Sequence, residues 1–197
     1  MKFYLKSTLI FLLISSSVLA LAGPFSLRKG MTIKELKQHG ALVSDETPGF
    51  YHSRQLKNGH NSFESYTLIV SPTIGLCKII AVGKNIESNS SGAQIREVFD
   101  FLKEPLVAKY GSPSDNFDFL AVGSIWNDRG DWMMSLVKKE RHLATFWTSE
   151  NLPDNLKNIG LNAHALSPST GYLKLTYEFD NAEACLAELR TKGNATL

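Results

Sequence analysis

The chain lacks the short motifs by which most enzyme sites are recognised. It contains no G-x-S-x-G nucleophile elbow, no zinc-binding H-E-x-x-H, no Walker A loop and no dinucleotide-binding G-x-G-x-x-G. Its five histidines show no paired ligand spacing, and its two cysteines are too far apart in sequence to form a zinc knuckle. We therefore expect neither a metal nor a nucleotide cofactor.

The chain also lacks a run of Lys or Arg residues and an excess of either charge. Lys2 and Lys6 stand near the start, and beyond them 19 basic residues balance 19 acidic ones. A neutral chain without a basic patch offers no electrostatic attraction to the phosphates of nucleic acid. We expect no nucleic-acid partner.

Long apolar runs are scarce, and the one candidate lies at the N-terminus. Lys2 and Lys6 flank a short basic region that leads into the apolar segments 9–13 and 18–21. The sequence Ala20-Leu21-Ala22 fits the small-x-small rule for signal-peptide cleavage, with Gly23 as the first mature residue. The alternative is a membrane anchor, for which the apolar part is short, because a span needs about 20 residues.

We therefore predict that residues 1–22 are a signal peptide and that residues 23–197 form a single domain. No cysteine stands at the cleavage point, so the lipid attachment of a bacterial lipoprotein is excluded. After cleavage no transmembrane span remains. We expect the mature protein in the periplasm or outside the cell.

Cys77 and Cys185 are predicted to form a disulfide, because the thiols of exported proteins usually pair. Such a bridge closes a loop of more than 100 residues. By the chain-entropy argument it contributes about 4–5 kcal/mol to stability. The alternatives are two separate buried thiols or a catalytic cysteine, and the apolar strand around Cys77 disfavours the thiolate that a nucleophile requires.

The alternation of apolar residues and the turn signals predict an α+β fold. No helix of 10–15 residues separates successive strands, which favours an antiparallel sheet with helices packed on it over a parallel βαβ sheet. The order of elements also suggests two helix-then-strands halves. Strands are predicted at residues 50–56, 66–70, 76–82, 119–126, 132–137, 143–147, 159–166 and 172–179. Helices are predicted from Thr32, over residues 91–110 with a kink or break near Pro105, and after Asp180.

The first helix begins with a capping box formed by Thr32 and Glu35. The run Leu27-x-x-Gly30-Met31-Thr32-x-x-Glu35-Leu36-x-x-x-Gly40 resembles the helix opening of small bacterial envelope proteins. These include the SmpA/OmlA-type outer-membrane assembly lipoproteins and the β-lactamase-inhibitor-like domains. The resemblance covers about fourteen residues and implies helices packed on an antiparallel sheet. The chain departs from the lipoprotein members in having no lipid-attachment cysteine.

One polar segment, residues 126–132, is a candidate binding site. It is predicted to form a hairpin tip where two carboxylates and a guanidinium lie between two tryptophans, an edge that suits a ligand or a protein partner. The alternative is a polar turn whose tryptophans pack across the strands. The predicted binding residues are Trp126, Asp128, Arg129, Asp131 and Trp132.

Two functional hypotheses follow. The first is a non-catalytic module, such as an inhibitor, an immunity-type protein or an envelope accessory protein. It binds another envelope or secreted protein through one sheet face or the segment 126–132. The second is an envelope hydrolase in which His142 or His164 acts with Asp128 or Asp131. An exposed aromatic patch on a sheet face favours the first hypothesis, and a pocket gathering a histidine and carboxylates favours the second.

Overall fold

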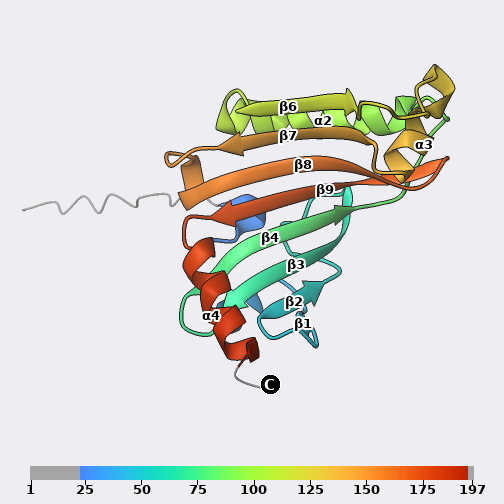
Figure 1. Cartoon of the computed structure of the whole chain (residues 1–197). Helices are drawn as coiled ribbons and strands as arrows, with labels where there is room; N and C mark the ends of the chain where they lie inside the picture. The colour runs from blue at the N-terminus through green and yellow to red at the C-terminus, as the bar shows by residue number, and fades with distance from the viewer. Residues whose placement is uncertain (1–22, 195–197) are drawn as a thin grey trace, which may run out of the picture.

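All strands of the computed structural model, which describes residues 23–194, join one antiparallel sheet (Figure 1). The predicted α+β class is therefore confirmed, whereas the predicted signal peptide lies outside the described residues. The strands are β1 (Val43–Ser44), β2 (Phe50–Ser53), β3 (Phe63–Ser71), β4 (Gly75–Gly83), β5 (Ile86–Glu87), β6 (Asp115–Leu120), β7 (Arg141–Thr148), β8 (Leu156–Ser167) and β9 (Thr170–Phe179). The α-helices are α1 (Ile33–Leu36), α2 (Ala93–Tyr110), α3 (Trp132–Val137) and α4 (Ala182–Asn194). Three 3-10 turns lie at Pro24–Ser26, Arg129–Asp131 and Pro153–Asn155.

The sheet consists of two consecutive four-strand meanders that meet through their last strands. Its order is β1-β2-β3-β4-β9-β8-β7-β6, and the short β5 pairs with β9. The first meander follows α1 and the second follows α2. The two helix-then-strands halves suggested by the sequence are thus present as a topology, with β1 and β6 as the outer edges.

The central hairpin β3–β4 forms where the sequence predicts it, and Gly75 fixes its turn. Gly75 has a φ of +80°, and a Cβ atom there would lie 2.2 Å from the carbonyl oxygen of Gly30. The amide of Gly30 donates to the carbonyl of Leu76 at 2.8 Å, and the amide of Leu76 donates to the carbonyl of Met31 at 2.9 Å. The turn therefore holds the segment that leads into α1, whose predicted Thr32–Glu35 capping box is present.

Helix α2 packs its apolar side on the sheet and runs without interruption through Pro105. The predicted break is wrong, because Leu102 and Leu106 on either side of the proline are both buried against the same core. Pro105 itself lies on the exposed side, where water can bind the carbonyl group that loses its intrahelical partner. None of the helices within residues 23–194 is long and apolar enough to cross a membrane.

The strands predicted at residues 119–126, 132–137 and 143–147, read as a meander over residues 117–148, are only partly present. The first lies earlier, as β6 at residues 115–120, and residues 132–137 form α3 and not a strand. Trp132, Met133 and Leu136 are buried at helical spacing. Ser135 donates from its hydroxyl to the carbonyl of Trp132 at 2.8 Å. A run of six mostly apolar residues does not distinguish a buried strand from a buried helix by periodicity. Consequently residues 126–132 are not a hairpin tip but part of a long connection from β6 to α3.

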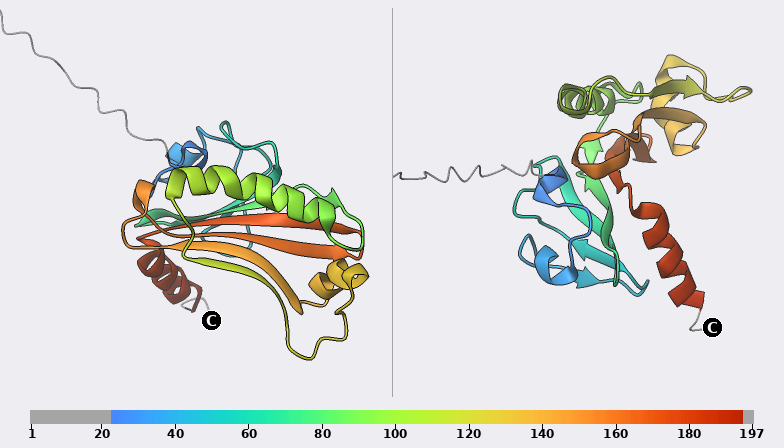
Figure 2. Two further views of the ribbon diagram at one scale, coloured as in Figure 1. Left: turned by 90° about the horizontal axis from the view of Figure 1, so that it is seen from above. Right: turned by 90° about the vertical axis from the view of Figure 1, so that its left-hand side faces the viewer.

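The two faces of the sheet differ in how far helices cover them (Figure 2). Helix α2 and the N-terminal segment with α1 lie on one face, which carries the main core. On the opposite face, α4 covers only the end of the β3–β4 hairpin, where it forms a second, smaller core. On this side β6 and most of β7, β8 and β9 carry no covering helix, and only the short α3 packs against β7 and β8, at the end away from α4. We call this side the open face.

Candidate functional site

The open face carries an exposed aromatic patch at its β6 edge. Phe117 and Phe119 are 40% and 47% exposed. The ring of Phe117 lies edge-on to Phe119 and to Phe146, with centroids 6.1 and 5.9 Å apart, and Phe119 stacks on His142 at 5.0 Å. We call Phe117, Phe119, His142 and Phe146 the aromatic patch. Contiguous apolar surface of this kind marks interaction sites on soluble proteins.

The strand β6 is oriented with its apolar side outward. Its alternating sequence would normally turn the phenylalanines toward the core and the polar residues toward water. Instead Asn116 faces the side of α2, where its Oδ1 accepts hydrogen bonds from Lys103 Nζ at 2.7 Å and Thr145 Oγ1 at 2.8 Å. Asp118 accepts from the guanidinium of Arg141 at 3.3 Å. Polar contacts with the covered side thus hold the phenylalanine side of β6 toward the open face.

The apolar surface continues beyond β6. Val122 and Ile125 follow on the connection to α3 and are strongly exposed. Four of the seven strongly exposed large hydrophobic side chains within residues 23–194 therefore lie between positions 117 and 125. This concentration in one segment distinguishes the patch from the scattered apolar residues found on any protein surface.

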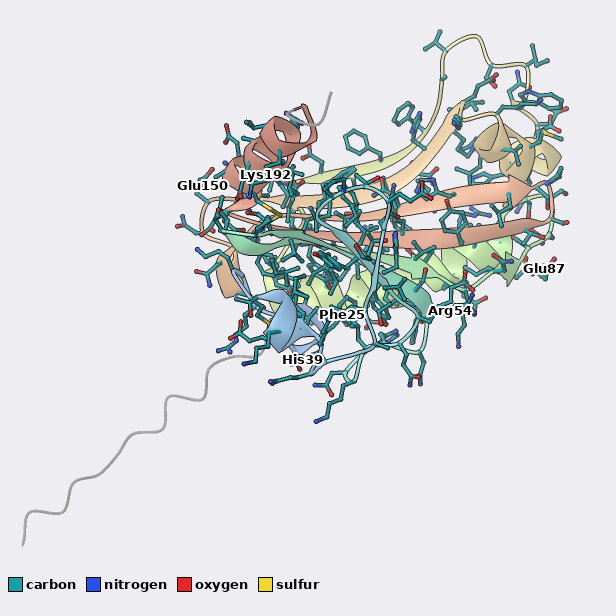
Figure 3. All side chains as sticks on the ribbon, turned by 90° about the horizontal axis from the view of Figure 1, so that it is seen from below. Phe25, His39, Arg54, Glu87, Glu150 and Lys192 are labelled. Atoms are coloured by element: carbon teal, nitrogen blue, oxygen red, sulfur yellow. A yellow bond between two sulfur atoms is a disulfide. The ribbon has the colours of Figure 1, made fainter. Side chains whose placement is uncertain are left out.

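A cavity of about 470 Å³ opens on the open face at the end away from α4, and we call it the α3 pocket. The β7–β8 pairing stops at Ala144 and Asn162, and α3 packs beside the point where the strands separate. In Figure 3, Lys192 on α4 and the nearby Glu150 mark one end of the sheet, and Glu87 on β5 marks the other end, where α3 lies. The polar side chains that line the α3 pocket are Lys139, Arg141, His142, Asn162, His164 and Tyr172.

The α3 pocket is electropositive. Lys139 and Arg141 line it and no carboxylate does. Burial lowers the pKa of His164, and the nearby charges of Lys174 and Lys139 lower it further, so that the ring is neutral near pH 7. Arg141 is paired with Asp118, whereas Lys139 and Lys174 form no ion pair with any residue in the described range.

The predicted binding residues differ in their exposure. Trp132 is only 7% exposed, between two guanidinium groups whose carbons each lie 5.5 Å from its ring centroid. It therefore supports α3 and is not accessible to a partner. Asp128 and Arg129 are exposed, while Trp126 and Asp131 are half-buried along the connection. A binding role for these four residues stays a prediction.

The histidines of the hydrolase hypothesis come together without their acidic partners. His142 and His164 both line the α3 pocket, but Asp128 and Asp131 do not. Among the described residues no three His, Cys, Asp or Glu side chains are close enough to share a metal ion. The pocket therefore offers cations and aromatic rings and lacks the carboxylate that would orient a catalytic histidine.

The predicted disulfide is confirmed by the geometry of Cys77 and Cys185, whose sulfur atoms are 2.04 Å and whose Cα atoms are 6.3 Å apart. It joins β4 to α4 and lies in the smaller core beside Ile69 and Leu189. The bridge thus fixes α4 at one end of the sheet and leaves the other end of the open face accessible.

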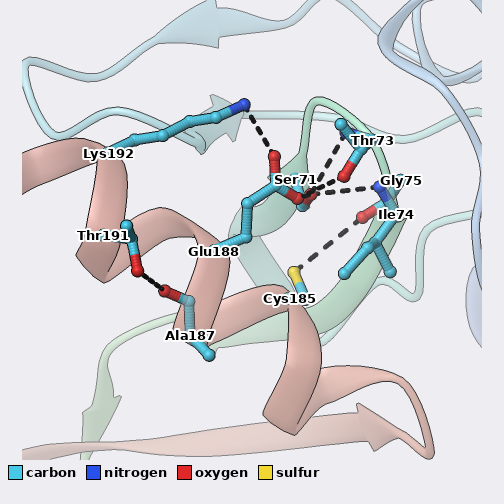
Figure 4. Close-up of polar contacts among 9 residues, drawn as sticks. All are labelled: Ser71, Thr73, Ile74, Gly75, Cys185, Ala187, Glu188, Thr191 and Lys192. Atoms are coloured by element: carbon cyan, nitrogen blue, oxygen red, sulfur yellow. Dashed lines mark hydrogen bonds and ion pairs between the residues drawn. The ribbon is translucent and has the colours of Figure 1, made fainter.

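Glu188 provides a second anchor for α4 at the β3–β4 turn (Figure 4). Its carboxylate accepts hydrogen bonds from the hydroxyls of Ser71 and Thr73, the latter at 2.5 Å, and pairs with Lys192 at 2.6 Å. Lys192, followed by the two hydroxyl groups, lowers the pKa of Glu188 to about 2. The carboxylate is therefore ionised at neutral pH and bound to three partners.

Acid is expected to weaken this anchor. Because the pKa of Glu188 is lower in the folded state than in the unfolded chain, its contribution is fully present above the unfolded value of about 4.5. The contribution is lost as pH falls through about 2. The unfolding midpoints of the wild type and Glu188→Gln should therefore differ most near neutral pH and converge in strong acid. Glu183→Gln, an exposed change on the same helix, is the control. A difference between Glu188→Gln and the wild type that does not vary with pH would contradict the assignment.

The aromatic patch and the α3 pocket are the features of the open face from which a function can be argued. The patch offers apolar surface, and the pocket offers positive charge and hydrogen-bond donors. Comparisons of the chain with protein-family models, with curated proteins and with solved structures found no significant match.

Proposed function

We propose that the protein is an exported, non-catalytic module that binds another envelope or secreted protein through the open face of its sheet. The observation that carries this proposal is the outward orientation of the aromatic patch, in which Phe117 and Phe119 are exposed beside the stacked ring of His142. Burying such a ring in an interface contributes about 1.5–3 kcal/mol per side chain. The resemblance of residues 27–40 to small envelope proteins supports the same class.

The charges along the β6 edge and in the α3 pocket favour a partner of a different kind over a second copy of this chain. Asp115 and Asp118 lie on β6, and acidic side chains on an edge strand disfavour pairing with an identical edge. The α3 pocket beside the patch is electropositive. A complementary partner presents an apolar surface with acidic groups next to it.

The double variant Phe117→Ser/Phe119→Ser is expected to weaken partner binding at least about 30-fold, which corresponds to about 2 kcal/mol. Its unfolding midpoint should change little, because both rings are already partly exposed. The matched control is Phe101→Ser on α2, a 62% exposed ring away from the open face. A photo-crosslinking residue at Val122 and another at Phe101 should identify the partner, and titration with the purified partner then gives the affinities.

Partner crosslinking from both positions to the same extent would contradict the proposal. So would equal affinities of the wild type and the double variant. Light scattering after size-exclusion chromatography tests whether a second copy of this chain binds the open face instead. A dimer that the double variant abolishes would assign the open face to a second copy of this chain.

A further inference from the structure

We infer that the α3 pocket binds a carboxylate, and that this carboxylate belongs to an Asp or Glu side chain of the partner protein. The assignment of the carboxylate to a partner protein rests on the proposed function. The preference for a carboxylate rests on the pocket alone. The pocket would then serve as the polar anchor beside the aromatic patch, which supplies the apolar contact.

Four donor side chains form a square array on β8 and β9. His164 lies directly opposite Tyr172, and Asn162 lies directly opposite Lys174. Directly opposed residues of antiparallel strands have Cβ atoms about 4.5–5.5 Å apart, and diagonal neighbours remain within reach of long side chains. The rings of His164 and Tyr172 stack with their centroids 5.1 Å apart and form one end of the array. Asn162, His164 and Tyr172 line the pocket, and Lys174 lies beside Asn162 on β9 just outside this lining. A carboxylate in the pocket can therefore accept hydrogen bonds from more than one of these side chains.

Lys139 adds a further cation in a conformation that points to a role beyond stability. It follows α3 with a φ of +59°, and Glu140 beyond it donates from its amide to the carbonyl of Ser135 at 3.0 Å. Glycine is the usual residue at this helix-end position, because side chains are strained at positive φ. A lysine here lines the pocket without an ion-pair partner among residues 23–194.

The apolar part of the lining favours an acidic side chain over a free inorganic anion. Leu136, Val137, Ala144 and Ala163 line the same cavity as the donors. They can bury the methylene groups of a glutamate or aspartate while the carboxylate reaches the cationic end. A phosphate ion has no such stem and would leave these residues without a contact.

The test is an NMR titration of the mature, disulfide-bonded protein with acetyl-Glu-N-methylamide, which carries one side-chain carboxylate. Its neutral control is acetyl-Gln-N-methylamide. The acid should shift the ring signals of His164 and the amide signals of Lys139 and Asn162 saturably, with a Kd on the order of 1 mM. The amide should bind at least about ten times more weakly, the factor expected for loss of a charged hydrogen bond.

Lys139→Gly separates binding from structure, because its two expected effects have opposite signs. Removing the strained side chain should raise the midpoint of thermal unfolding by about 2–4 °C. The same change should lower the affinity for the acid at least about fivefold, as should Lys174→Gln. Lys37→Gln at the end of α1 is the control and should alter neither quantity.

Equal binding of the acid and the amide would overturn the inference. Binding of inorganic phosphate about ten times tighter than the acid would assign the pocket to phosphate instead. The two proposals fail separately. If the acid binds but the patch variant leaves partner capture unchanged, the proposed function fails and the pocket assignment stands. If the acid does not bind but the patch variant abolishes partner capture, the pocket assignment fails and the proposed function stands.

Discussion

Replacing both Cys77 and Cys185 by alanine is expected to lower the free energy of unfolding by about 4–5 kcal/mol. The bridge spans 108 residues of sequence, so its removal restores a large amount of conformational freedom to the unfolded chain. Both cysteines are fully buried in the smaller core. Guanidinium unfolding of the wild type, the reduced wild type and the double variant measures the loss.

The reduced wild type is the matched control for this change. It keeps both sulfur atoms in the core, whereas the alanine variant also removes packing around α4. The free energies of unfolding of the reduced wild type and the alanine variant should agree to within about 1 kcal/mol if loss of the cross-link is the main effect. A reduced protein about as stable as the oxidised one would show that the bridge constrains little.

Gly92→Ala is expected to lower the free energy of unfolding by about 3–4 kcal/mol, the sum of backbone strain and overpacking. Gly92 precedes α2 with a φ of +73°, and a Cβ atom there would lie 2.0 Å from Cε3 of Trp132. The indole cannot easily move, because it is enclosed by the guanidinium groups of Arg96 and Arg141.

Gly123→Ala isolates the backbone contribution in this comparison. Gly123 also has a positive φ, but a Cβ atom there meets nothing within 4 Å. Its replacement should cost only about 1 kcal/mol. The excess loss in Gly92→Ala should be accompanied by weaker binding of the acidic probe, because Trp132 begins the helix that borders the α3 pocket. Equal losses of unfolding free energy in the two variants would indicate that the Trp132 side chain moves to make room for the added methyl group.

The hairpins could be predicted from sequence because their signals are local. The β3–β4 turn needs the residue types found at Pro72 and Gly75, and the flanking strands are apolar and rich in β-branched residues. The disulfide followed from the presence of only two cysteines in a chain expected to be exported. Helix α2 is predicted by its helical spacing, and the break expected near Pro105 is absent because the residues on both sides of the proline pack on the same core.

The candidate site could not be predicted in the same way. The alternation in β6 indicates a strand with one apolar side, but not that the apolar side faces away from the helices. That orientation depends on partners distant in sequence, among them Lys103 for Asn116 and Arg141 for Asp118. The α3 pocket likewise combines residues 136–144 with residues 162–172, which only the complete sheet brings together.

The junction between the two meanders has a consequence for the order of folding. Strand β4 pairs with β3 on one side and with residues 174–178 of β9 on the other. Until β9 has been made, the first meander therefore exposes β4 as an unpaired edge. Such long-range pairing slows folding, since the closing of a long loop precedes the contacts that stabilise it. We therefore expect the middle of the sheet to form last. A chain of this design stays incompletely folded until its C-terminal strands have been made.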